Sequence, residues 1–311
     1  MLGVLPFFHS FGYTYTLWFP LLNGFKAAYH PNPADAKAIG ELAAVHHPTV
    51  FLSTPTFCLG HLRKCTREQF GSIRYLLVGA EKLRPALADA YEKKFGIRLY
   101  EGYGCTEMGP VVSVNCPDAY QGGSAGRMMP NVSARVVDPE TLAPLAAGET
   151  GLLLVKGPSR MSGYIGEPER TASALVDGFY STGDLARFDA DGFLYIVDRL
   201  ARFSKIAGEM VSHSRIEEAV REIIGDHPCV VTGVPDDQRG ERLVVLYTKQ
   251  DLEPSELWRQ LCATRLPRLW IPKREDMHVV DAIPTLGTGK LDLQAVKRRA
   301  QEFSKQYAEA V

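Results

Sequence analysis

A chain of 311 residues with 45% apolar and 23% charged side chains has the composition of a globular protein with a large domain and a small one. Its formal net charge of −1 argues against a nucleic-acid-binding protein, because phosphate contacts require surplus Lys and Arg. Six cysteines without CxxC pairs favour reduced thiols and a cytoplasmic location over a disulfide framework. Cys58, His61 and Cys65 are close in sequence, but no second ligand pair follows them, so we interpret them as core packing.

Strands and helices alternate through the first hundred residues. We expect strands at 4–11, 25–30, 49–53, 73–78 and 98–100, and helices at 13–23, 35–46, 55–63 and 84–95. This alternation predicts an α/β layer with a mostly parallel sheet. The apolar start lacks a basic n-region and is interrupted by His9, Gly12, Pro20 and Gly24, so it predicts neither a signal peptide nor a membrane span. It has instead the character of buried core, which leads us to expect that the chain is incomplete.

The pattern changes after Pro117. Short strands expected at 122–126, 132–137, 150–156 and 192–197, separated by Gly and Pro turns, predict a small β-barrel or sandwich subdomain. From about residue 202, helices at 214–224, 255–264 and 293–308 and strands at 229–234 and 243–248 predict an α+β domain. We therefore divide the chain into 1–116, 117–200 and 201–311, with the main boundary near residues 199–202.

The stretch YEGYGCTE, residues 100–107, is the strongest candidate for a ligand site, and we expect it to form a turn. Gly102 and Gly104 flank Tyr103 and allow the backbone to bend sharply near a ligand. Tyr103 offers an aromatic face to a purine, Thr106 a hydroxyl to a phosphate, and Glu107 a hard oxygen to Mg²⁺. Taken alone, the stretch is equally compatible with a Gly-rich turn that carries a solvated Glu.

Four further stretches carry candidate chemistry. In VGAE, residues 78–81, a strand runs into a glycine turn, the place where parallel sheets bind ligands. In YSTGD, residues 180–184, Asp184 is suited to accept both hydroxyls of a ribose, whereas residues 189–192 read as a hairpin turn rather than a Ca²⁺ loop. In VDRLARFSKIAGEMV, residues 197–211, Arg199 is a natural second ribose contact. The alternative is that the basic residues of this stretch are solvent-exposed residues of a connector.

The fourth stretch, IPTLGTGKL at residues 283–291, places Lys290 on a Gly-rich loop before a helix. Backbone amides and a flexible cation at such a position form an anion clamp. It is not a P-loop, because Leu291 follows Lys290 where that motif needs Ser or Thr.

These stretches together resemble the adenylate-forming superfamily of acyl-CoA synthetases, peptide-synthetase adenylation domains and luciferases. The resemblance rests on the ordered set LPFFHSFG, GAE, YEGYGCTE, STGD, DRLARFSKIAGEMV and PTLGTGK. Within the superfamily, FFHSFGYT, YEGYGCTE and RFSKIAGEMVS look most like the acyl-acyl-carrier-protein synthetase part of bacterial bifunctional acyltransferase/synthetases. The implied fold is α/β: a partial large adenylation domain, made of a parallel α/β layer and a small β-barrel subdomain, followed by a small, mobile α+β domain.

The resemblance implies a role for each matching position. The nucleotide site would comprise Gly79, Ala80 and Glu81 as the wall of the adenine pocket, Tyr103 stacked on the base, Gly104 next to it, and Asp184 and Arg199 on the ribose. Catalysis would rest on Thr106 at phosphate, Glu107 at Mg²⁺, and Lys290, which would bridge the carboxylate and the α-phosphate. His9 and Phe11, with Phe7 and Phe8, would border the acyl pocket, and Lys205 and Gly208 would line the thiol channel.

The implied reaction is the ATP- and Mg²⁺-dependent activation of a fatty acid, expected to be long-chain, followed by transfer to a thiol. The acceptor is the phosphopantetheine of acyl carrier protein or, alternatively, coenzyme A. A basic run of Arg259, Arg265, Arg268, Lys273 and Arg274 suits an acidic carrier protein, or else simply solvates its face. The resemblance also suggests a fused acyltransferase partner and association with the inner face of the membrane.

The sequence departs from the superfamily in two places. No Ser/Thr/Gly-rich phosphate loop precedes LPFFHSFG, and the hinge position two residues after Arg199 is Ala201 rather than Asp or Lys. Arg202 is a candidate substitute at the hinge. We therefore expect one of three kinds of chain: a fragment of a full synthetase, a partial enzyme that has lost adenylation and only binds AMP, acyl-adenylate or a carrier protein, or an inactive remnant whose C-terminal domain is an interaction surface. The filled catalytic positions favour the first.

Overall fold

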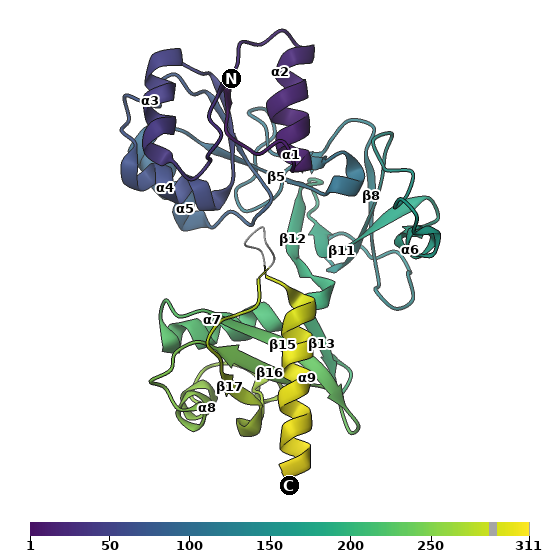
Figure 1. Cartoon of the computed structure of the whole chain (residues 1–311). Coiled ribbons are helices and arrows are strands. Elements are labelled where there is room, and N and C mark those ends of the chain that lie inside the picture. Colours follow the sequence, from purple (N-terminus) through teal and green to yellow (C-terminus); the bar gives the residue numbers. More distant parts are fainter. Residues whose placement is uncertain (286–290, 311) are drawn as a thin grey trace. The chain divides into compact units, whose positions relative to one another are not determined.

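The computed structural model describes residues 1–285 and 291–310, with side chains described through Ser304. The chain divides into two compact units, Met1–Val197 and Asp198–Val311 (Figure 1). The boundary expected near residues 199–202 follows directly after this division. Each unit has its own sheets and its own hydrophobic core.

The first sheet of unit 1 has seven strands in the order β2-β1-β3-β4-β5-β6-β7. The first five in sequence are parallel to their neighbours, which confirms the predicted parallel layer, and β6 and β7 are added antiparallel. Their bounds are β1 Leu2–Gly3, β2 Ala28–Tyr29, β3 Val50–Ser53, β4 Tyr75–Val78, β5 Leu99–Gly104, β6 Val111–Val114 and β7 Arg127–Met128.

Helices cover this sheet on both faces. The helices α3 (Ala36–His46), α4 (Pro55–Lys64) and α5 (Pro85–Phe95) bury one face, where Leu2, Phe51 and Tyr91 are fully enclosed. The segment of α1 (Ser10–Gly12), a π-helix (Tyr13–Trp18) and α2 (Phe19–Leu22) lies against the other face. There Gly3 fits tightly, because a Cβ built on it would lie 2.6 Å from the side chains of Thr16 and Tyr29.

Cys58, His61 and Cys65 are all buried in the core between α4 and its neighbours. His61 Nδ1 lies 3.2 Å from the Tyr91 hydroxyl, and Cys65 donates from Sγ to the carbonyl of Ala36. Burial raises the pKa of the Cys58 thiol to about 12. This confirms the prediction that these residues pack the core.

The second sheet of unit 1 is antiparallel, in the order β10-β11-β9-β8, with β12 paired to β11. Its bounds are β8 Ser133–Val137, β9 Gly151–Lys156, β10 Leu175–Val176, β11 Phe179–Phe188 and β12 Leu194–Arg199, with the short helix α6 Pro168–Ala174 before β10. A small core that includes Leu153, Val155 and Leu194 lies beneath it. This is the β-rich region expected after residue 117.

Unit 2 is built on a sheet in the order β14-β13-β16-β15, with β17 parallel to β16. Alternate residues of β15 and β16 belong to different cores: Val231 and Val245 pack with α7 and α8, whereas Val230 and Val244 pack with α9. Helices on both faces explain why these strands are apolar throughout. The bounds are β13 Phe203–Ile206, β14 Glu209–Ser212, α7 His213–Ile224, β15 Cys229–Asp236, β16 Gly240–Tyr247, α8 Pro254–Cys262, β17 Met277–Val279 and α9 Leu293–Ala310.

Three local predictions are wrong. The strand expected at 4–11 is β1 at Leu2–Gly3, because His9 accepts a hydrogen bond from the amide of Phe11 and starts α1. Residues 122–126 form turns rather than a strand, with the Ser124 amide bonded to the carbonyl of Gln121. The expected turn at 100–107 is strand β5 as far as Gly104. No helix in the described part of the chain is long and apolar enough to cross a membrane.

Candidate nucleotide and acyl site

The candidate residues of unit 1 gather at the carboxyl ends of its parallel strands. β3 ends at Ser53, β4 at Val78 and β5 at Gly104, and the stretches GAE and CTE follow the last two directly. Since β3, β4 and β5 are parallel neighbours, their carboxyl ends meet at one edge of the sheet. Open α/β sheets bind ligands at such an edge.

The turn after β4 is held in place from two sides. A Cβ built on Gly79 would lie 3.2 Å from the carbonyl oxygen of Gly102 and 3.6 Å from Phe11 Cε1, so the strands and the Phe11 ring close tightly around it. Ala80 adopts a left-handed backbone, φ 69°. Glu81 Oε2 accepts hydrogen bonds from the amide of Thr56 at 3.2 Å and from its hydroxyl at 2.6 Å. The turn is thereby fastened to the start of α4.

Glu101 is a further residue of this edge, which the sequence reasoning did not single out. Its Oε1 accepts a hydrogen bond from the amide of Leu83 at 3.1 Å, so β5 holds the segment that follows GAE. Burial raises the pKa of this carboxyl to about 7. A strand carboxylate that accepts from the amide of a distant loop residue leaves no signal in the periodicity of the sequence. Glu101 can therefore be recognised only from the fold.

Tyr103 and Asp184 join the two sheets of unit 1. The Tyr103 hydroxyl donates to Asp184 Oδ2, and the Asp184 amide donates to the Thr182 hydroxyl at 3.0 Å. Asp184 is only 3% exposed. Burial and the nearby Asp184 both raise the pKa of Tyr103, so its hydroxyl keeps its proton. Residues 81 positions apart in sequence, each assigned to the nucleotide by resemblance, therefore touch in the fold.

The segment after β5 places two candidate groups close together. Gly104 is required sterically, because a built Cβ would lie 2.1 Å from the carbonyl oxygen of Pro110. A 3₁₀-helix, Thr106–Met108, follows. The Thr106 hydroxyl lies 2.9 Å from that of Ser10 on α1. Ser10 lies within the FFHSFG stretch but was not proposed as a site residue. Its hydroxyl is a second hydrogen-bonding group beside that of Thr106.

Glu107 is oriented by two residues of the loop between β9 and α6. The Tyr164 hydroxyl donates to Glu107 Oε1 at 2.9 Å, and the amide of Met161 donates to its carbonyl at 2.8 Å. The Arg170 guanidinium lies over the Tyr164 ring, 3.9 Å from its centroid. Among the described residues, no group of three or more His, Cys, Asp or Glu side chains is arranged to hold a metal. A single oriented carboxylate nevertheless fits Mg²⁺ that arrives with a nucleotide, since Mg²⁺ binds through one or two carboxylates plus phosphates.

His9 and Phe11, assigned to the acyl pocket, lie at the start of α1. The Phe11 ring approaches Gly79 and packs edge-on against Tyr15, with centroids 6.1 Å apart. His9 caps α1 through Nδ1. Phe8 is 86% exposed. The structure thus brings Phe11 to the GAE turn, whereas Phe8 points to solvent.

In unit 2, Lys205 and Gly208 belong to the hairpin of β13 and β14. Its two turn residues, Ala207 and Gly208, both have positive φ, 49° and 89°, as a type I′ turn requires. Lys205 is exposed, and its amide donates to Glu241 Oε2 at 2.8 Å. Arg199 lies in unit 2 and its amide donates to Asp198 Oδ1 at 2.8 Å. Lys290 lies outside the described residues.

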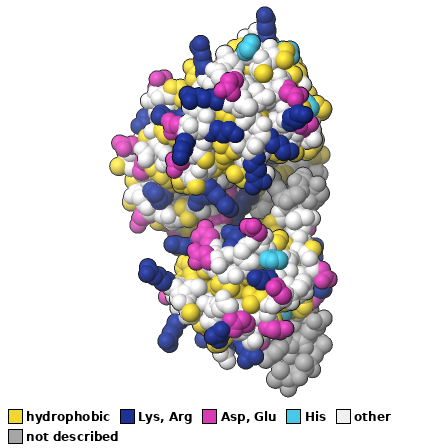
Figure 2. Space-filling model, turned by 90° about the vertical axis from the view of Figure 1, so that its left-hand side faces the viewer, with side chains coloured by type: hydrophobic (Ala, Val, Ile, Leu, Met, Phe, Trp, Pro, Cys, Tyr) yellow, Lys and Arg dark blue, Asp and Glu magenta, His cyan; other side chains and the backbone are white. Residues whose placement is uncertain are grey.

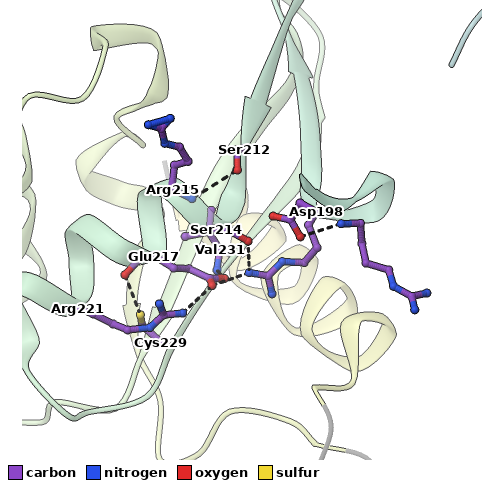
Figure 3. Close-up of polar contacts among 10 residues, drawn as sticks. Asp198, Ser212, Ser214, Arg215, Glu217, Arg221, Cys229 and Val231 are labelled. Atoms are coloured by element: carbon purple, nitrogen blue, oxygen red, sulfur yellow. Dashed lines mark hydrogen bonds and ion pairs between the residues drawn. The ribbon is translucent and has the colours of Figure 1, made fainter. Parts of the chain in front are cut away.

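A buried ionic cluster in unit 2 was not foreseen (Figure 3). Glu217 on α7 is 2% exposed and accepts from Arg202 at 2.5 Å, from Arg221 at 3.1 Å and from the amide of Val231 at 2.8 Å. Arg202 also donates to the Ser214 hydroxyl at 3.0 Å. The guanidinium suggested as a substitute at the hinge is therefore engaged within unit 2, where it holds residues 198–202, the connector between the two units, to α7.

Comparison with known proteins gives the family. The family profile described as AMP-binding enzyme matches residues 1–165, which include the GAE turn, Thr106 and Glu107. The chain belongs to the AMP-binding enzyme family. The architecture of the adenylate-forming superfamily expected from the sequence is thereby confirmed, whereas the closer likeness to an acyl-acyl-carrier-protein synthetase is not shown.

Its relatives include ligases for aliphatic and aromatic acids. The long-chain-fatty-acid–CoA ligase of Bacillus subtilis is 32% identical over 94% of this chain and 52% of its own length. The 3-hydroxybenzoate–CoA ligase of Aromatoleum is 33% identical over 81% of this chain and 49% of its own. ATP-bound MatB from Rhodopseudomonas palustris matches 96% of this chain and 59% of its own, with a TM-score of 0.81 and 28% identity. The chain spans about half the length of the curated relatives it matches.

Proposed function

We propose that the protein containing this chain is an AMP-forming acid–thiol ligase, which activates a carboxylic acid with ATP and passes the acyl group to a thiol. The proposal rests on the convergence of GAE, Thr106, Glu107 and the Tyr103–Asp184 pair at one edge of the sheet in a chain of this family. It uses ATP and Mg²⁺ as cofactors.

Each side chain has a proposed task at this edge. The hydroxyls of Thr106 and Ser10, 2.9 Å apart, hold phosphate oxygens, and Glu107 holds Mg²⁺. Mg²⁺ neutralises phosphate charge when bound. Asp184 receives the ribose hydroxyls, with Tyr103 as the donor that fixes its orientation, and Arg199 supplies the second ribose contact. Gly79, Ala80 and Glu81 form the wall beside adenine.

Lys290 completes the chemistry. A carboxylate that attacks an α-phosphate brings two anions together, so a cation between them stabilises the transition state. The acyl-adenylate formed is a mixed anhydride, which a thiol then attacks while AMP leaves. In this proposal residues 201–311 are the mobile domain, which presents Lys290 first and the hairpin of Lys205 and Gly208 afterwards. Phe11 and His9 border the acyl pocket beside the GAE turn.

We propose a long-chain fatty acid as substrate and coenzyme A as acceptor. Both are supported by relatives from Bacillus subtilis and Salmonella typhimurium, each of which is named long-chain-fatty-acid–CoA ligase. The hydroxybenzoate ligases among the relatives make an aromatic acid the competing substrate. We place the enzyme in the cytoplasm.

A carrier-protein acceptor is the second candidate, favoured by one surface of unit 2. Five Lys and Arg side chains around α8 and the segment after it are all exposed: Arg259, Arg265, Arg268, Lys273 and Arg274. Arg259 pairs with Glu256 at 2.7 Å, which offsets part of the charge of this surface. Such a surface suits an acidic carrier protein. Supplying apo- and holo-carrier protein against coenzyme A distinguishes the two acceptors.

The test is acid-dependent exchange between ATP and pyrophosphate, with palmitate, a short acid and 3-hydroxybenzoate compared. Lys290→Ala should lower exchange at least about a hundredfold, because loss of one transition-state charge contact is of that order. Lys297→Ala, an exposed lysine on α9, is the matched control and should leave exchange unchanged. Absence of exchange from folded protein, together with absence of acyl transfer from a supplied adenylate, would contradict the proposal for this chain.

A further inference from the structure

Tyr180, the first residue of the YSTGD stretch, has a hydroxyl that the proposed function does not use. The residue lies on β11, is 7% exposed and packs in the core that also contains Met108, the neighbour of Glu107 in sequence. Packing requires only the aromatic ring, which Phe would supply equally well. The Tyr180 hydroxyl lies 3.5 Å from that of Tyr164, so a polar contact accompanies the packing. Buried tyrosine hydroxyls usually have such a partner.

The hydrogen bonds of the two tyrosines run in one direction. Each hydroxyl carries a single proton, and a carboxylate can only accept. The Tyr164 hydroxyl donates its proton to Glu107 Oε1 at 2.9 Å, so in its contact with Tyr180 it can only accept. Tyr180 is therefore the donor to Tyr164, and we refer to the two as the hydroxyl chain. In such a chain each hydrogen bond polarises the next and strengthens it.

Tyr164 is also held by α6. Its amide donates to the Thr171 hydroxyl at 2.9 Å, and a Cβ built on Gly163 would lie 2.7 Å from Thr171 Cγ2, so this loop packs closely on the helix. The Arg170 guanidinium that lies over the Tyr164 ring is itself paired with Glu167 at 3.0 Å. With backbone and ring held, the freedom left to the hydroxyl is the direction of its proton, which the hydroxyl chain restricts.

Strand β11 also carries Asp184, which the proposed function places on the ribose. The register of β11 against β9 is irregular after Ser181, and Gly183 there has φ 71°. Bulges of this kind re-aim side chains and are frequent next to active sites. Tyr180 precedes the bulge and Asp184 follows it. One strand therefore serves the ribose group directly and Glu107 through the hydroxyl chain.

Burial gives the hydroxyl chain more weight than contacts at the surface. Figure 2 shows Lys, Arg, Asp and Glu side chains on one face of the chain, where water and salt screen their interactions. Tyr180 is enclosed, and Tyr164 and Glu107 are partly enclosed, so polar contacts among them are screened less. Removal of one hydroxyl from the chain should therefore be felt at the carboxylate.

We propose that Tyr180 is a positioning residue of the Mg²⁺ site, which acts on Glu107 through the hydroxyl of Tyr164. The inference rests on the proposed function, because it takes Glu107 as the group that holds Mg²⁺. A carboxylate has about four lone-pair sites, so the bond to Oε1 leaves positions for a cation. Hydrogen-bond partners orient the ligands of a metal, and their loss typically weakens metal binding by about ten- to a hundredfold.

The test is equilibrium binding of ATP to the whole chain, measured by calorimetry in Mg²⁺ and again in EDTA. Tyr164→Phe keeps the ring and removes the hydroxyl, so it should weaken ATP binding about tenfold in Mg²⁺ and leave binding in EDTA unchanged. Tyr180→Phe should weaken binding in Mg²⁺ about threefold, because a neutral hydrogen bond is lost one step away. The double variant should match Tyr164→Phe alone, because Tyr180 acts only through Tyr164.

The matched control is Tyr195→Phe. It removes a hydroxyl that donates to Asp189 Oδ2 at 3.1 Å, a contact between tyrosine and carboxylate elsewhere in the same unit. This variant should bind ATP as the parent does in both solutions. Thermal unfolding of each variant, compared with the parent, checks that the exchange of ring for ring leaves the chain folded.

Three results would overturn the proposal. Equal weakening in Mg²⁺ and EDTA would show that the tyrosines act through packing. Unchanged binding in Tyr180→Phe would remove this residue from the site, and a further loss in the double variant would show a route that bypasses Tyr164. Absence of ATP binding by the folded parent would contradict the proposed function and the inference together. The assay contains no acid, so the expected binding results without acid-dependent exchange of pyrophosphate would contradict the ligase proposal alone.

Discussion

At the scale of single residues, Glu107 is the group through which the proposed site meets Mg²⁺. One of its oxygens accepts from Tyr164, which leaves its orientation fixed by a neutral donor rather than by a competing cation. Glu107→Gln should keep the Tyr164 contact, since an amide oxygen also accepts, but should weaken Mg²⁺·nucleotide binding. We expect the Mg²⁺ concentration for half-maximal exchange to rise about tenfold, from loss of one charged contact of about 1.5 kcal/mol.

The matched control for Glu107 is Glu149→Gln, an exposed carboxylate in a loop of the same unit. It should leave the Mg²⁺ titration of exchange unchanged. An identical Mg²⁺ dependence in Glu107→Gln and the parent would remove Glu107 from the metal site.

Glu101 gives a prediction about pH. Burial raises its folded-state pKa to about 7, above the unfolded value of about 4.5, so the folded protein binds more protons between these values. Its contribution to stability is therefore present below about pH 4.5 and is lost as the pH rises through about 7. Glu101→Gln stays neutral and still accepts from the amide of Leu83.

The expected result is a pH-dependent stability difference between Glu101→Gln and the parent in urea unfolding measured from pH 5 to pH 8. Glu101→Gln should unfold at higher urea than the parent at pH 8, and the difference should shrink as the pH falls towards 5. Glu68→Gln, an exposed carboxylate of unit 1, serves as the control and should show no such pH-dependent gain. A constant difference at every pH would show that the effect comes from packing rather than from ionisation.

At the scale of elements, the cluster of Arg202, Glu217 and Arg221 ties the start of unit 2 to helix α7 and to β15 (Figure 3). Arg202→Met removes the closest cation from a carboxylate that is 2% exposed. Breaking a buried ion pair on one side is strongly destabilising because it strands the partner, so we expect a loss of about 3 kcal/mol in the free energy of unfolding.

Arg215→Met, at an exposed position on the same helix, is the control and should change the free energy of unfolding by less than about 0.5 kcal/mol. The double variant Arg202→Met, Glu217→Leu should recover part of the loss, because no charge is then left stranded. Equal losses in the single and double variants would show that Arg202 stabilises unit 2 through packing alone.

Regular elements of the fold could be predicted from local patterns. Helices α3, α4 and α5 and the strands between them follow apolar periodicity and clear boundary signals: Asp35 and Thr54 accept from amides at helix starts, and Gly96, φ 72°, ends α5. The apolar run at 4–11 predicted a strand, but its residues form a turn and the start of a helix, which His9 caps. Periodicity does not report a cap made by an imidazole.

In the candidate site, as in the fold, local features could be predicted from the sequence and contacts between distant elements could not. Thr106 and Glu107 could be proposed from the sequence because they belong to one short motif whose side chains have the chemistry that phosphate and Mg²⁺ require. The partners that orient them come from distant elements: Ser10 for Thr106, Tyr164 for Glu107, and Thr56 for Glu81. Such pairs depend on how the two sheets and the helices of unit 1 meet, which no local pattern encodes. The tasks assigned to Asp184, Arg199 and Lys290 remain predictions.

At the scale of the whole molecule, two units with separate cores are joined through the connector that follows Val197. Backbone between independently packed bodies opens locally more easily than backbone within a core. Arg199 is exposed, ends strand β12 and follows the division at Val197 directly, and the Arg202 side chain donates to Glu217 and Ser214. Trypsin should therefore cut first after Arg199 and leave fragments 1–199 and 200–311.

Mass spectrometry of a short digestion time course measures the order of cleavage. Arg199→Gln should delay the first cut, whereas Arg202→Met, by releasing the connector from α7, should accelerate cleavage after Arg199 and so link this experiment to the buried cluster. First cuts within β15 or β16, where backbone is enclosed by helices on both faces, would contradict the division into two independently stable units. The same first cut at unchanged rate in Arg202→Met would show that Glu217 does not restrain the connector.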